Sequence, residues 1–260
     1  MHTLLNQCRL ICSFAYLPRV LCLLSELSPT SIDPTLTLAK PNSRLNIANM
    51  AAPESVKIGD LTGNWVMVPF PSPLTRHTPL SLLQNKSLSG DTDSVLALQG
   101  VGWLIRKAIG LATVTQHLKQ YFDEKDPSIT HIDFTQTVTG GIKGTTELRT
   151  LDYQWRPHSD YLFGDLKGRS RWIKLADLDE ADEDQKFLRQ DWLPESAEGE
   201  MVESYVENDD KGWTGHQVWG FQEIKVAEEK ERRHVRNVVV RKGDDVQRIK
   251  LVFDWVGKDE

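Results

Sequence analysis

An arginine among apolar residues is the side chain in this sequence best suited to bind a ligand. Arg236 alternates with Val238 and Val240, so the three share one face if the segment is a strand. An unpaired cation on an apolar inner face is costly, and a ligand carboxylate could pair with its guanidinium through two hydrogen bonds. The alternative is a structural arginine that pairs with an internal carboxylate or packs over Trp65. Arg236 is our candidate ligand-binding residue, and the structural interpretation stays open.

A turn at Gly243 and Asp244 would bring the returning strand beside Arg236 with a defined register. In that register the face of Arg236 is mostly apolar, and the opposite face, with Asn237 and Lys250, is more polar. We therefore expect the first face to point into the interior. Its members on the returning strand are Gln247, Ile249, Leu251, Phe253 and Trp255.

The residues that usually carry catalysis or bind metals show no organised pattern. Ser94 and Ser204 have no evident base partner, and the glycines at Gly140 and Gly141 indicate a hairpin turn and not a phosphate-binding loop. The acidic stretch 177–184 lacks the central glycine and terminal glutamate of a calcium loop, so we interpret it as a solvated helix. We assign no catalytic residue, metal or cofactor, and favour a role other than catalysis. The histidines lack metal-ligand spacing: His117, His131, His158, His216 and His234.

Composition points to an ordinary globular protein. Of 260 residues, 39% are hydrophobic and 26% charged, and the net charge is −6 with the basic residues dispersed. A nucleic-acid surface would need clustered Lys and Arg, so we expect no nucleic-acid partner. The cysteines Cys8, Cys12 and Cys22 all precede residue 50, which gives no sign of an oxidising compartment. We expect a cytoplasmic monomer.

Two segments are expected to lie outside the working domain. Residues 1–49 are interpreted as a disordered or spurious N-terminal extension, with a targeting segment as the alternative, because Met50 is a plausible start. Residues 68–84, rich in proline, are interpreted as a disordered insertion that arises from a translated intron, or as a long surface loop. The remainder of 50–260 is predicted to form a single domain.

Within that domain, alternating apolar and polar residues predict about nine or ten strands joined by short turns. The strands begin near residue 63 and include 113–122, 129–139 and 232–241. In the second of these, Phe134 lies on the more apolar face. Between the first strand and the next, residues 93–112 carry the spacing of an amphipathic helix interrupted by glycines, which predicts two short helices.

Two motifs in this order resemble those of a known superfamily. Gly63-Asn64-Trp65 is the G-x-W pattern of calycins, which include lipocalins and fatty-acid-binding proteins. The run Val101-Gly-Trp-Leu-Ile-Arg-Lys107 resembles the lid segment of intracellular lipid-binding proteins. The C-terminal strand departs from the family because it lacks the Arg-x-Tyr pair that holds a fatty-acid carboxylate there.

The resemblance implies a mainly β protein, namely an up-and-down antiparallel β-barrel with a short helix-turn-helix lid. It implies an intracellular carrier that binds a small hydrophobic ligand, lipid or fatty-acid-like, inside the barrel, with Arg106 and Lys107 at the portal and in transient contact with membranes. We expect Trp103 to cap the barrel mouth. Two alternatives stay open: a small-molecule isomerase or haem-binding enzyme on the same barrel, and a structural or interaction protein with a filled interior. The candidate ligand-binding residues are Arg236, Trp103, Leu104, Phe134 and Phe253.

Overall fold

The computed structural model describes residues 50–68, 88–139, 142–226 and 229–258. The predictions for the N-terminal extension 1–49, and for all but the first residue of the insertion 68–84, fall outside the described residues. Among the described residues, no helix has both the length and the apolar character needed to cross a bilayer.

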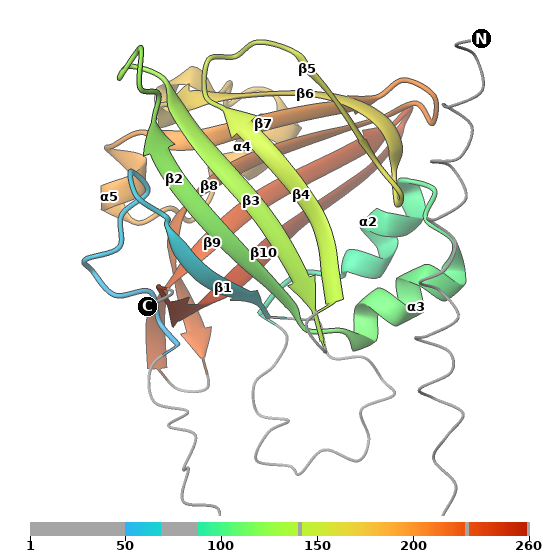
Figure 1. Ribbon diagram of the computed structural model, residues 1–260, viewed down its shortest axis with the longest axis horizontal. Helices are drawn as coiled ribbons and strands as arrows, with labels where there is room; N and C mark the ends of the chain where they lie inside the picture. Colours follow the sequence, from blue (N-terminus) through green and yellow to red (C-terminus); the bar gives the residue numbers. More distant parts are fainter. Residues whose placement is uncertain (1–49, 69–87, 140–141, 227–228, 259–260) are drawn as a thin grey trace, which may run out of the picture. The chain divides into compact units, whose positions relative to one another are not determined.

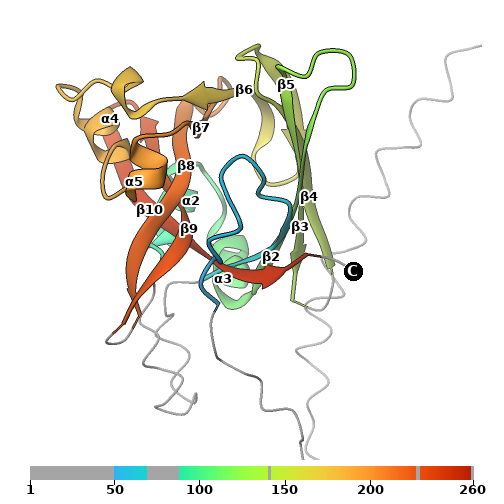
Figure 2. The same ribbon diagram turned by 90° about the vertical axis from the view of Figure 1, so that its left-hand side faces the viewer.

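The domain is built on a single antiparallel sheet of ten strands in the order β4-β3-β2-β1-β10-β9-β8-β7-β6-β5. β1 pairs with both β2 and β10, so the first and last strands of the chain are neighbours in the sheet. The sheet as a whole is strongly curled (Figures 1 and 2). No backbone ladder joins the edge strands β4 and β5 in the described part of the chain, so the sheet forms a half-barrel. The predicted up-and-down barrel with a helix pair is confirmed in this form. The strands are β1 Gly63–Met67, β2 Val114–Phe122, β3 Thr130–Val138, β4 Ile142–Thr150, β5 Arg156–Asp160, β6 Gly164–Ile173, β7 Met201–Asn208, β8 Trp213–Val226, β9 Glu229–Lys242 and β10 Asp245–Gly257.

The register predicted around Arg236 is confirmed. Leu251 pairs with Arg236 and Ile249 pairs with Val238, so the expected residues of β9 and β10 share the concave face. Between β5 and β6 the chain turns where the Asp160 carboxylate accepts hydrogen bonds from the backbone N–H groups of Leu162 and Phe163 at 2.8 and 2.7 Å.

The convex face of β7–β10 is also buried, which the sequence did not indicate. It is covered by a 3₁₀ turn at Leu175–Asp177 and by the helices α4, Glu183–Leu188, and α5, Pro194–Ala197 (Figure 2). The acidic residues of 177–184 are largely solvent-exposed, as predicted, but the helix begins only at Glu183 and continues to the apolar Leu188. Leu188 is fully buried, and Asp184 forms ion pairs with Arg241 and Arg248, each at 2.6 Å.

The predicted helix pair is confirmed as α2, Thr92–Leu98, and α3, Trp103–Leu111. Val95 of α2 packs against Val238, Val240 and Ile249 at one end of the sheet. α3 has no buried residue.

The G-x-W motif has a packing explanation. Trp65 is fully buried, its indole N–H donates to the Leu61 carbonyl at 3.0 Å, and its ring lies 4.6 Å from that of Trp255. Gly63 has φ of +144°, and a Cβ there would lie 2.6 Å from Trp255 Cζ3 and 2.9 Å from the Gly257 carbonyl oxygen. Glycine is required because the Trp255 ring occupies the space of a side chain.

Candidate functional site

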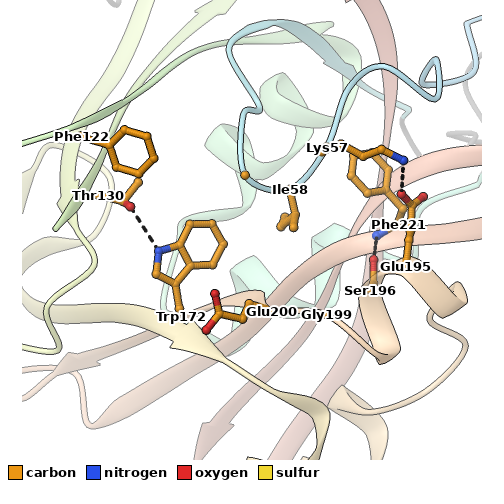
Figure 3. A pocket seen from close by; sticks show the side chains of 11 residues that line it. Lys57, Ile58, Phe122, Thr130, Trp172, Glu195, Ser196, Gly199, Glu200 and Phe221 are labelled. Carbon is orange, nitrogen blue, oxygen red and sulfur yellow. Dashed lines mark hydrogen bonds and ion pairs between the residues drawn. The ribbon is translucent and has the colours of Figure 1, made fainter. Parts of the chain in front are cut away.

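A cavity of about 480 Å³ lies at the end of the half-barrel remote from α2 and α3. Helix α3 leads directly into the start of β2, whereas Phe122, which lines the cavity, lies at the other end of that nine-residue strand. In Figure 3, Phe122, Trp172 and Ile58 surround the hollow, and Glu195 of α5 borders it. The lining residues are Lys57, Ile58, Gly59, Phe122, Thr130, Trp172, Glu195, Ser196, Gly199, Glu200 and Phe221.

Hydrogen bonds fix the walls of this cavity. The Trp172 indole N–H on β6 donates to the Thr130 hydroxyl on β3 at 3.2 Å, so it joins the two sides of the half-barrel. Opposite, the buried Ser196 hydroxyl accepts the Phe221 backbone N–H at 2.9 Å. These bonds hold two aromatic walls in defined positions before any ligand binds.

The carboxylate at the edge of the cavity is held in its charged form. Burial alone would raise the pKa of Glu195, but hydrogen bonds from Arg232 and Lys57 outweigh it, and the pKa is lowered. The Lys57 ammonium lies 2.8 Å from this carboxylate. Glu195 is therefore ionised at neutral pH and unsuited to act as a general acid.

Deeper on the concave face, Arg236 is buried among aromatic rings, with 4% of its surface exposed. Its guanidinium carbon lies 3.7 Å from the Trp219 ring centroid, and one Nη donates to the Gln116 side-chain oxygen at 2.9 Å. Phe134 and Phe253 lie 5.1 and 4.8 Å away, so three predicted ligand-binding residues come together. Burial lowers the pKa of Arg236, and the positive charge of Arg149 lowers it further.

Arg149 on β4 is a member of this cluster that sequence reasoning missed. It forms an ion pair with Glu147, donates to Ser204 on β7, and lies 3.5 Å from the Ser170 hydroxyl on β6. Its guanidinium carbon is 5.4 Å from the Trp219 ring centroid. The signal was available, because Phe134, predicted on the apolar face, pairs across strands with Glu147, and Arg149 lies two residues further along β4 on the same face.

The cavity and the cation cluster are adjacent layers of the same concave face. On β6, Trp172 of the cavity is two residues from Ser170 of the cluster, and on β8, Phe221 is two residues from Trp219. Two residues span about 7 Å along a strand. A ligand in the cavity thus sits one side-chain layer from two guanidinium groups.

The predicted lid and portal residues lie elsewhere. Trp103 and Leu104 are 63% and 58% exposed on α3, and their roles as barrel cap and ligand-binding residues stay predictions. Arg106 and Lys107 both pair with Asp93 of α2, at 3.2 and 3.3 Å, and Arg106 also donates to the Val101 carbonyl. Their roles in ligand binding and membrane contact stay predictions. The described residues contain no group of three or more His, Cys, Asp or Glu side chains placed to hold a metal ion.

Comparison with curated proteins decides the family. The chain is 30% identical over 207 residues to "Probable pericyclase scpY" of Mollisia scopiformis. The aligned region covers 80% of this chain and 95% of that protein. It is 31% identical over 182 residues to "Pericyclase pydY" of Acremonium sp, covering 70% and 93%. The chain belongs to this pericyclase family. No protein-family model matches it.

Solved structures that match this chain include fatty-acid-binding proteins. They include "REP1-NXSQ fatty acid transporter", with a TM-score of 0.39 and 15% identity, covering 76% of this chain and 98% of that one. A fatty acid binding protein of Schistosoma mansoni has a TM-score of 0.39 and 11% identity, covering 78% and 100%. The fluorescent protein UnaG has a TM-score of 0.41 and 12% identity, covering 75% and 97%.

The carrier function expected from the sequence is wrong, because the relatives that match most of this chain are named as enzymes. The expectation relied on the barrel, which both carriers and enzymes use. The isomerase held as an alternative agrees better with these relatives.

Proposed function

We propose that this protein is a pericyclase that isomerises a polyunsaturated small molecule on the concave face of the half-barrel. The observation that carries the proposal is its relation to named pericyclases over most of its length. In a pericyclic reaction, bonds form and break together in one cyclic transition state. Such a reaction needs no nucleophile, no proton transfer and no redox change, so we assign no cofactor.

The cavity offers what such a reaction requires from a protein. An extended polyene must be folded until its reacting carbons approach, and holding it in that shape can supply a large part of the rate enhancement. Trp172, Phe122, Phe221 and Ile58 provide apolar walls, and a volume of about 480 Å³ lies within the usual range for small-molecule sites. Because the Thr130 hydroxyl fixes the Trp172 ring, little side-chain freedom is lost on binding.

The expectations from the sequence about partners and location are part of this proposal. A small apolar partner fits the aromatic cavity, and the cytoplasmic location and monomeric state stay predictions. The transient membrane contact at α3 also stays a prediction, supported by the exposed Trp103 and Leu111.

Conversion without a change of mass tests the proposed function. Purified protein is incubated with the substrates of scpY and pydY, the products are separated by chromatography, and their masses are measured by mass spectrometry. We expect a new peak with the mass of the substrate, absent with heat-denatured protein. A product that has gained or lost atoms, or no conversion where the two relatives give it, would contradict the proposal.

A further inference from the structure

A tight turn near the start of the domain borders the cavity. The segment 50–62 runs between the two walls of the half-barrel (Figure 2). Within it, the Asp60 backbone N–H donates to the Lys57 carbonyl at 2.9 Å and closes a turn with Ile58 and Gly59 at its tip. Both tip residues line the cavity.

A second hollow, of about 310 Å³, adjoins the cavity at this turn. The two share three lining residues, Gly59, Phe122 and Thr130, so they meet beside the tip of the turn. Phe122 is 64% exposed although it is large and apolar, and an exposed aromatic ring common to two neighbouring hollows is a natural contact for a ligand that extends through both. The second hollow is lined by Gly59, Asp60, Thr62, Gln120, Tyr121, Phe122, Thr130 and Lys258.

The second hollow is more polar than the cavity. Its Asp60 carboxylate and Lys258 ammonium lie 3.0 Å apart, and each side chain is more than half exposed. An exposed ion pair contributes little to stability, so a ligand can exchange hydrogen bonds with it at low cost. A ligand carboxylate would be repelled by Asp60 and an ammonium by Lys258. The pair therefore favours an uncharged group that both donates and accepts hydrogen bonds.

The turn is fixed from both sides of the half-barrel. The Gln120 side-chain amide on β2 donates to the carbonyls of Ile58 and Gly59 at 3.2 and 2.8 Å. Arg232 on β9 donates to the Val56 carbonyl at 2.8 Å. The place where the two hollows meet is therefore defined before any ligand binds.

Packing does not require glycine at position 59. Its φ lies outside the left-handed region, and a Cβ there would meet no atom of the described residues within 4 Å. Because Gly59 lines both hollows, that open space lies where they meet. A large side chain at this position would fill it without disturbing the fold.

We propose that the cavity and the second hollow form one continuous binding site, and that Gly59 keeps the passage between them open. This rests on the proposed function and names its substrate class as a linear molecule too long for the cavity alone. The apolar part of the substrate lies against Trp172, and an uncharged polar part lies against Asp60 and Lys258. Gly59 thereby determines the length of substrate that the protein accepts.

A series of linear primary amides tests the inference without any turnover. Octanamide, decanamide, dodecanamide and tetradecanamide carry the same uncharged end group on apolar chains of increasing length. Each further CH₂ group that is buried should strengthen binding by about fourfold. Isothermal titration calorimetry measures the dissociation constants, and we expect the affinity of the wild type to rise through the whole series.

Gly59→Leu should fill the passage and leave the fold intact. Its affinity for octanamide should equal that of the wild type, but the gain with chain length should end at a shorter amide. Tetradecanamide should therefore bind at least about tenfold more weakly than it does to the wild type. Gly110→Leu on α3 is the matched control, because a Cβ there also meets none of the described atoms within 4 Å and α3 lies at the other end of the half-barrel. Circular dichroism checks that each variant is folded.

The end group is tested with tetradecanoate, which has the same chain length as tetradecanamide but carries a charge. It should bind about fivefold more weakly, because its carboxylate faces that of Asp60. Asp60→Asn should narrow this difference. The asparagine oxygen can still accept the Thr62 backbone N–H, which lies 3.0 Å from the Asp60 carboxylate, so the turn is preserved.

Equal chain-length dependence in Gly59→Leu and the wild type, or no binding of any amide to the wild type, would overturn the continuous site. Tetradecanoate that binds as tightly as tetradecanamide would overturn the uncharged end group. These results are independent of the isomerisation assay. Isomerisation without an effect of Gly59→Leu on amide binding removes the passage and leaves the proposed function standing. A passage blocked by Gly59→Leu in a protein that isomerises nothing keeps the site and removes the proposed function.

Discussion

Replacing Gly63 with alanine should destabilise the fold strongly. A Cβ at this position would lie 2.6 Å from Trp255 Cζ3 and 2.9 Å from the Gly257 carbonyl oxygen, well inside contact distance. A residue other than glycine at φ of +144° adds backbone strain of about 1–3 kcal/mol. Overpacking against a fixed ring adds a further 1–3 kcal/mol, so we expect a loss of roughly 2–6 kcal/mol.

Urea denaturation followed by tryptophan fluorescence measures this loss, and Gly59→Ala is the control. A Cβ at Gly59 would meet nothing within 4 Å, so its free energy of unfolding should change by no more than about 0.5 kcal/mol. Combining Gly63→Ala with Trp255→Ala should recover part of the loss, because the clash is with that ring. If Gly63→Ala unfolds at the wild-type urea concentration, the packing explanation of the G-x-W motif is refuted.

Three further predictions concern the cavity and two buried titratable groups. Trp172→Ala removes a wall of the cavity and its hydrogen bond to Thr130, so the isomerisation rate should fall at least about tenfold. Trp155→Ala, on the convex side, should leave the rate unchanged, and equal losses from the two variants would contradict the proposed role of the cavity. Burial, reinforced by Arg236, lowers the pKa of His234 well below 6.5, so the unfolded chain takes up a proton near that pH that the folded protein does not. Stability should therefore rise with pH through this range, by up to about 1.4 kcal/mol per pH unit, and His234→Leu should flatten the slope in pH-dependent urea melts; an unchanged slope would disprove this. Burial would raise the pKa of Glu203, but hydrogen bonds from His216 and Arg171 lower it below 4.5 overall. The contribution of Glu203 to the stability of the fold should be present above about pH 4.5 and be lost as the pH falls through its lower folded-state pKa. Glu203→Gln should remove this acid dependence, and thermal melts at several pH values measure it.

The sequence predicted local features of the fold well. Period-two alternation placed Arg236, Phe253 and Leu251 on one face, and the glycines near α2 and α3 indicated two helices and not one. These features depend on neighbours in the chain. The cover of the convex face was missed because its acidic stretch is solvent-exposed on one side and apolar only at scattered positions such as Leu188.

The site was harder to predict than the fold because it is non-local. The cavity brings together Ile58, Thr130 and Phe221, which no spacing in the sequence relates. Arg149 gains its significance only when β4 lies opposite β6 and β7, where it meets Ser170 and Ser204. The function was predicted wrongly because the two motifs indicate the barrel fold and not the chemistry inside it.

Running the reaction in deuterium oxide tests the central claim most directly. A pericyclic rearrangement exchanges no hydrogen with solvent, so the isomerised product should have the same mass as the product made in ordinary water once exchangeable hydrogens are washed back. An isomerase that works by proton removal and return would place solvent deuterium on carbon. A product without carbon-bound deuterium supports a pericyclase on this half-barrel, and a deuterated one contradicts it.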